Sequence, residues 1–171
     1  MPYFAAALVR TADGWAGHEL DLDEVGDIDG VADLLRDLVE GGAGPALMFL
    51  EEDDEYFLVV RVDAAVDEAR SFISDVRAVE TSELAARLYD ESSADPVLSV
   101  DEGAAPAEDE EDTARPEGEP GGDDAILADL GTRPPDLRDL CVEEGLLPAD
   151  VIYTLCERAG CAEVLEELRG A

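Results

Sequence analysis

One histidine and three cysteines are the side chains of this sequence best suited to nucleophilic catalysis or metal binding. His18 stands in a strand-like run directly before Glu19, and no Ser or Cys forms a recognisable catalytic motif with it. Cys141, Cys156 and Cys161 contain no CxxC pair, which zinc sites favour, and their odd number argues against a disulfide framework. We therefore expect a surface histidine, cysteines that pack as small buried residues, no metal, no cofactor and no enzymatic activity.

A run of five acidic residues is the second feature with chemical potential. Glu51, Glu52, Asp53, Asp54 and Glu55 lie between two apolar runs. They offer oxygens for a calcium ion, which takes roughly six to eight, but they lack the alternating spacing and the central glycine of an EF-hand loop. Because like charges at this density are costly to bury, we expect all five to form a hairpin tip that projects into water. This acidic tip is the candidate partner-binding site.

The net charge narrows the class of partner. With 45 acidic and 11 basic residues, the chain carries a formal charge of −34. Nucleic acid and anionic lipid would be repelled, so direct binding to either is not expected. A basic protein surface would be attracted, and its association would be accelerated. The charge also has explanations without a partner, namely solubility, a GC-rich genome or a halophilic source.

The sequence also bears on location. No segment reaches the roughly 18 consecutive apolar residues of a membrane span. The first ten residues, MPYFAAALVR, lack the basic start of a signal peptide. Three scattered cysteines fit a reducing compartment. We therefore expect a cytoplasmic protein without a membrane segment.

The first 90 residues show strand and helix patterns in the order ββαβββα. Asp13-Gly14 separates two β-favouring runs and predicts a type I′ hairpin turn. Apolar residues at helical spacing from Val31 to Val39 predict a helix with a cap at Asp29 and an end at Gly41-Gly42. The expected strands cover residues 3–9, 15–20, 46–50, 56–62 and 70–75, and a second helix runs from a cap at Thr81 to about residue 89. This order predicts an α+β domain, with an antiparallel sheet and helices on one face.

The rest of the chain divides into two parts. Residues 91–123 hold 12 acids and one base, with much Pro, Gly and Ala, and predict a disordered acidic linker. Residues 124–171 predict a small all-α module of about four short helices. The residues that suit helix starts are Pro134-Pro135 and Pro148, and those that suit helix ends are Gly131, Gly145 and Gly160.

Several segments, in order along the chain, resemble a known family. They are YFAAALVR at the start, the Asp13-Gly14-Trp15 turn, GPALMFLEEDDEYFLVVRVD at 44–63, FISD at 72–75 and CVEEGLLPADVI at 141–152. Together they are similar to the tRNA adenosine deaminase-associated proteins of high-GC Gram-positive bacteria. The name of that family reflects a gene neighbourhood, so the resemblance implies a functional link with the deaminase and assigns no catalytic or binding residue.

The chain does not carry the deaminase signature itself. Such enzymes hold zinc with an H-x-E…P-C-x-x-C pattern, whereas His18 precedes Glu19 directly and no PCxxC occurs. Our leading hypothesis is a non-catalytic accessory protein that binds the basic, tRNA-facing surface of tRNA adenosine deaminase. The alternative is a homodimeric structural or regulatory module unrelated to tRNA modification. An enzyme with an unrecognised carboxylate site is a third hypothesis, because 45 acids make many pairs available.

Overall fold

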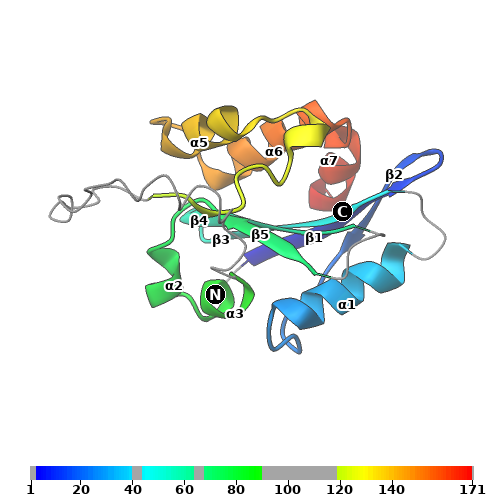
Figure 1. The fold of residues 1–171 in the computed structure, drawn as a ribbon, viewed down its shortest axis with the longest axis horizontal. Coiled ribbons are helices and arrows are strands. Elements are labelled where there is room, and N and C mark those ends of the chain that lie inside the picture. The colour runs from blue at the N-terminus through cyan, green and yellow to red at the C-terminus, as the bar shows by residue number, and fades with distance from the viewer. Residues whose placement is uncertain (1–2, 40–43, 64–67, 90–118, 171) are drawn as a thin grey trace, which may run out of the picture.

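The computed structural model describes residues 3–39, 44–63, 68–89 and 119–170 (Figure 1). The strands are β1 (Tyr3–Thr11), β2 (Gly14–Glu19), β3 (Ala46–Glu52), β4 (Tyr56–Val62), β5 (Arg70–Ile73) and β6 (Gly121–Gly122). The helices are α1 (Ile28–Val39), α2 (Ala78–Thr81), α3 (Glu83–Leu88), the 3₁₀ helix η4 (Ala128–Leu130), α5 (Pro134–Val142), α6 (Pro148–Ala159) and α7 (Ala162–Gly170). The strands form one antiparallel sheet in the order β2-β1-β3-β4-β5-β6, which confirms the predicted α+β class.

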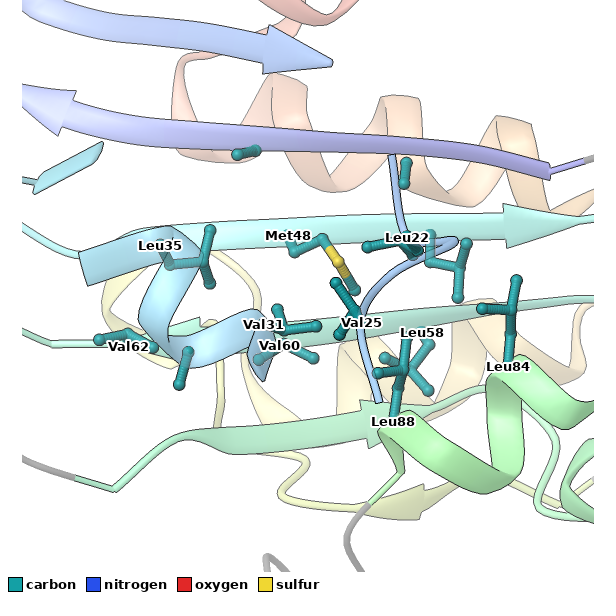
Figure 2. Packing of buried hydrophobic residues seen from close by; sticks show 14 of the residues in the cluster. Leu22, Val25, Val31, Leu35, Met48, Leu58, Val60, Val62, Leu84 and Leu88 are labelled. Carbon is teal, nitrogen blue, oxygen red and sulfur yellow. The ribbon is translucent and has the colours of Figure 1, made fainter. Parts of the chain in front are cut away.

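Helices cover both faces of this sheet. In Figure 1, α1, α2 and α3 form the lower layer and α5, α6 and α7 the upper one. The lower core holds apolar side chains such as Leu35, Met48 and Leu88 (Figure 2). The upper core joins Phe49 and Phe57 of the sheet to residues of the C-terminal helices. All residues of β3 and β4 are buried, as two-sided cover requires, because alternate side chains point to opposite faces.

Polar contacts also tie the upper helices to the sheet. Arg61 of β4 is 5% exposed, and its Nη1 donates to the carbonyl oxygen of Ile126 at 2.8 Å and to Asp129 Oδ1 at 2.6 Å. Its Nη2 donates to Asp129 Oδ2 and to Asp63 Oδ1, both at 2.9 Å. The hydrogen bonds from Arg61 hold the pKa of Asp129 below its usual value, so this carboxylate is charged at neutral pH. Trp15 Nε1 donates to the carbonyl oxygen of Ala159 at 3.2 Å, which joins the first hairpin to the end of α6.

The first hairpin forms as expected, but its turn differs from the prediction. Gly14 pairs with Thr11, so the turn residues are Ala12 and Asp13, and neither has a positive φ. The Thr11 hydroxyl accepts from the Asp13 backbone N–H at 3.3 Å and donates to the Gly14 carbonyl at 3.1 Å. A side-chain oxygen thus supports this turn, and the predicted type I′ geometry at Asp13-Gly14 is wrong.

Two helix caps also lie beside the predicted residues. Asp27, rather than Asp29, caps α1, because its Oδ1 accepts from the Gly30 N–H at 3.0 Å. Ser82, rather than Thr81, caps α3, because its Oγ accepts from the Ala85 N–H at 3.1 Å. The short α2 precedes this cap, and β5 ends at Ile73 rather than at residue 75. The predicted helix end at Gly41-Gly42 lies outside the described residues.

The chain returns to the sheet before the C-terminal helices begin. Gly121 and Gly122 form β6 and pair with Ile73 and Phe72 of β5. Gly122 has a φ of +97°, and a Cβ there would overlap the carbonyl oxygen of Ser71, so the position requires glycine. Residues 119–123 therefore belong to the folded part, contrary to the linker predicted for 91–123. The rest of that predicted linker, 91–118, lies outside the described residues.

The start and end signals of the C-terminal helices are largely confirmed. Pro134 and Pro148 begin α5 and α6, and Gly160, with a φ of +91°, ends α6. Gly131 ends the first element, which is a turn and the 3₁₀ helix η4 rather than a longer helix. Helix α5 ends at Val142, before the predicted Gly145.

Candidate functional site

The turn between β3 and β4 presents three of the five predicted acidic residues to solvent. Asp53 and Asp54 have φ values of +53° and +59°, a left-handed conformation that Asp tolerates better than most residues. The Glu55 N–H donates to the Glu52 carbonyl at 3.0 Å and closes the turn. Asp53, Asp54 and Glu55 are exposed, so for them the predicted water-facing tip is confirmed. We call these three residues the acidic turn.

Glu51 and Glu52 do not project into water, and the prediction is wrong for them. Both are only 8% exposed. Glu51 accepts from Arg169 Nη2 at 2.6 Å, and this guanidinium also lies 4.2 Å from the ring centroid of Phe4. These contacts bring the end of α7 to β3. A cation from the far end of the chain thus offsets the cost of burying this carboxylate.

Glu52 is held on the opposite face of the sheet. Its Oε1 accepts from the Tyr56 hydroxyl at 2.8 Å and from Ser82 Oγ at 2.5 Å. Burial raises the pKa of Tyr56, so the phenol keeps its proton and donates it to Glu52. Glu51 and Glu52 are therefore structural residues with internal partners.

A groove lies beside the acidic turn, between the sheet and the loop that joins α5 to α6. Its volume is about 640 Å³, a size typical of cavities that hold ligands. The apolar part of its lining includes Phe57, Leu140, Val142, Leu146 and Leu147. Val142 and Leu147 are 60% and 50% exposed. The groove therefore offers apolar surface that the described residues do not cover.

Six carboxylates surround this apolar surface. They are Asp54, Glu55, Asp75, Glu119, Glu143 and Glu144. Asp75 pairs with Arg77 at 3.0 Å, but no Arg or His is among the described residues that line the groove. The acidic turn and the groove together form one anionic surface with an apolar centre, which we call the acidic groove.

The acidic groove does not hold a recognisable catalytic set within the described residues. Burial raises the pKa of Cys141 to about 12, so its thiol is protonated and a poor nucleophile at neutral pH. Ser74 Oγ accepts from the Phe57 N–H at 2.9 Å and is thereby a structural contact. His18 is exposed on β2, at the opposite edge of the sheet from β5 and β6. The described lining of the acidic groove thus offers carboxylates and apolar side chains, without an activated thiol or hydroxyl.

The cysteines match their predicted role in part. Cys156 and Cys161 are fully buried in the upper core, whereas Cys141 is half-buried at the acidic groove, and all three are free thiols. The described ranges contain no group of three or more His, Cys, Asp or Glu side chains placed to hold a metal ion. Within the same ranges, no helix is long and apolar enough to cross a membrane.

Sequence reasoning missed the apolar part of this surface. Val142 and Leu147 stand in the segment CVEEGLLPADVI, where two acids, a glycine and a leucine separate them from one another. The signal available was Leu146-Leu147 directly before Pro148, an apolar pair outside the helical repeat of α6. Their exposure depends on how α5 and α6 pack on the sheet, which local patterns do not report.

Comparison with known proteins gives one family match. Residues 3–162 match the family model described as "Rv3753c-like tRNA adenosine deaminase-associated protein". No curated protein and no solved structure matches the chain. The matched range covers the whole sheet, the lower helical layer and helices α5 and α6, and it ends at the first residue of α7. The match confirms the resemblance found in the sequence, and the chain belongs to the family of Rv3753c-like tRNA adenosine deaminase-associated proteins.

Proposed function

We propose that this chain is a non-catalytic accessory protein that binds tRNA adenosine deaminase through the acidic groove. The family description links the chain to that enzyme by association. The observation that carries the proposal is the acidic groove itself. Exposed carboxylates there surround the apolar residues Val142 and Leu147, which are exposed among the described residues, and no described lining residue is cationic. A surface of this kind is suited to a basic protein partner.

The chemistry of tRNA supports the choice of partner surface. An enzyme that acts on tRNA must neutralise phosphates, and it does so with Lys and Arg. A chain with a formal charge of −34 would be attracted to the same residues. Binding there would place this protein and tRNA in competition for one face of the enzyme. The accessory protein would then either limit tRNA access or protect the free enzyme until tRNA displaces it.

Neutralising the acidic turn is expected to slow association with the deaminase by about tenfold at low salt, since such charges act mainly through electrostatic steering. The variant is Asp53→Asn, Asp54→Asn, Glu55→Gln in the full chain, because these three are exposed while Glu51 and Glu52 have internal partners. Stopped-flow or surface-based kinetics with the purified enzyme measures the rate.

A matched control removes the same charge from the other side of the molecule. Asp29, Asp33 and Asp37 are exposed on α1, in the lower layer, and their change to Asn should slow association much less. An equal decrease in the association rate of both variants would mean that net charge alone, and not the acidic turn, attracts the enzyme. Failure of the two unmodified proteins to form a complex below about 50 mM salt, where screening is weak, would overturn the proposal.

A further inference from the structure

The acidic groove contains the exposed apolar side chains that most need an explanation. Within the described ranges, Val142 and Leu147 are the two large hydrophobic residues that stand exposed, and both line this groove. Single exposed apolar residues are common on protein surfaces, whereas neighbouring ones in a concave site typically mark an interaction surface. Leu147 lies directly before α6 and Val142 ends α5, so two elements supply this apolar centre.

The charges around this centre define what can occupy it. Asp54 and Glu55 come from the acidic turn, and Glu143 and Glu144 come from the loop between α5 and α6. All four are exposed and can pair with cations at little desolvation cost. An uncharged apolar ligand would make no favourable electrostatic interaction with these carboxylates, and an anionic ligand would be repelled by them.

The chain's own acidic segment is a poor occupant. Residues 91–118 carry a strong excess of acids, and the described chain resumes at Glu119, itself a lining residue. Like charges would oppose insertion of that segment into the acidic groove. Nucleic acid is disfavoured for the same reason.

From these observations we infer that the acidic groove binds an amphipathic peptide segment of a partner protein, whose neighbouring apolar side chains contact Val142 and Leu147 while flanking Lys or Arg residues pair with the surrounding carboxylates. Only the identity of the partner rests on the proposed function, because the class of segment follows from the groove. Cationic residues would speed encounter, and the apolar contacts would set how long the complex lasts.

The test uses the full chain and two synthetic fluorescent peptides of equal length and charge. One repeats Leu and Lys at helical spacing, and the other has Ser in place of every Leu. Measured by fluorescence anisotropy at about 150 mM salt, the Leu–Lys peptide is expected to bind about tenfold more tightly than the Ser–Lys peptide, a difference of about 1.4 kcal/mol. Equal affinities would overturn the inference, as would spermidine binding as tightly as the Leu–Lys peptide.

Two variants connect that preference to the groove. The double variant Val142→Ser, Leu147→Ser should abolish the difference between the peptides, while Leu147→Met should retain it. Position 147 is the N-cap of α6, where Ser is a favoured residue, so this change should not destabilise the fold. A preference that survives in the double variant would place the apolar contact elsewhere and contradict the inference.

These results are separable from the fate of the proposed function. If the deaminase binds and the two peptides bind with equal affinity, the inference fails and the accessory function stands. If the Leu–Lys peptide binds more tightly and the deaminase does not bind, the groove binds this class of segment from another protein.

Discussion

A chain that ends at Asp123, and so lacks α5, α6 and α7, is expected to lose its folded structure. Removal of these helices uncovers the upper face of the sheet. The apolar residues exposed there are Leu8, Leu47, Phe49, Phe57, Val59 and Phe72. Burial of each such side chain contributes about 1.5–3 kcal/mol. Their combined loss is comparable to the about 5–15 kcal/mol that stabilises a typical domain.

Circular dichroism and size-exclusion chromatography of residues 1–123 measure this effect. We expect aggregation or a non-cooperative melting curve. A full chain without residues 95–114 is the control, because that deletion removes only residues outside the described ranges. The entropy of closing a chain segment changes slowly with its length. A monomeric, cooperatively folded 1–123 chain would show instead that the C-terminal helices form a separable module.

Arg61→Met is expected to lower the free energy of unfolding of the full chain by about 3 kcal/mol, or its Tm by about 6–12 °C. Met fills the space of the aliphatic part of Arg61. It leaves Asp129, Asp63 and the Ile126 carbonyl without the Arg61 donor. Asp63 retains a contact with Arg70 at 3.2 Å. The loss arises from polar groups left without their partner at the junction of sheet and upper layer.

Arg133→Met is the matched control. Arg133 is 73% exposed and pairs with Asp136 three residues along the chain, so its loss should change stability by no more than about 0.5 kcal/mol. Thermal unfolding is followed by far-UV circular dichroism and by the fluorescence of Trp15, the single tryptophan, which contacts the end of α6. The two signals should shift together in Arg61→Met. Equal stability of the two variants would refute a structural role for Arg61.

Local sequence patterns predicted the bounds of helices and strands well where residues within one short segment determine them. Pro148 and Gly160 bound α6 because proline suits the first helical turn and glycine adopts the left-handed conformation at the end. The apolar run from Tyr56 to Val62 became β4 with the predicted bounds. That run contained a signal which the prediction did not use. Apolar residues at both odd and even positions indicate a strand covered on two faces, and hence a second helical layer.

The acidic tip could be predicted only in part, because two of its five residues are buried by contacts with residues distant in the sequence. Glu51 is buried through Arg169, which lies 118 positions away, and Glu52 through Ser82. Neither pairing leaves a trace in the local sequence. Composition likewise placed residues 119–123 in a linker, since two glycines have no strand propensity, while pairing with β5 makes Gly121 and Gly122 a strand.

Hydrogen exchange of the full chain, with and without purified tRNA adenosine deaminase, tests most directly the claim that the acidic groove is the partner-binding surface. At low salt we expect the enzyme to slow backbone exchange in two segments that are distant in sequence, 53–55 and 142–147, and to leave α1 unchanged. Slower exchange confined to α1 and α3, or a stable complex in which neither segment is protected, would contradict the account.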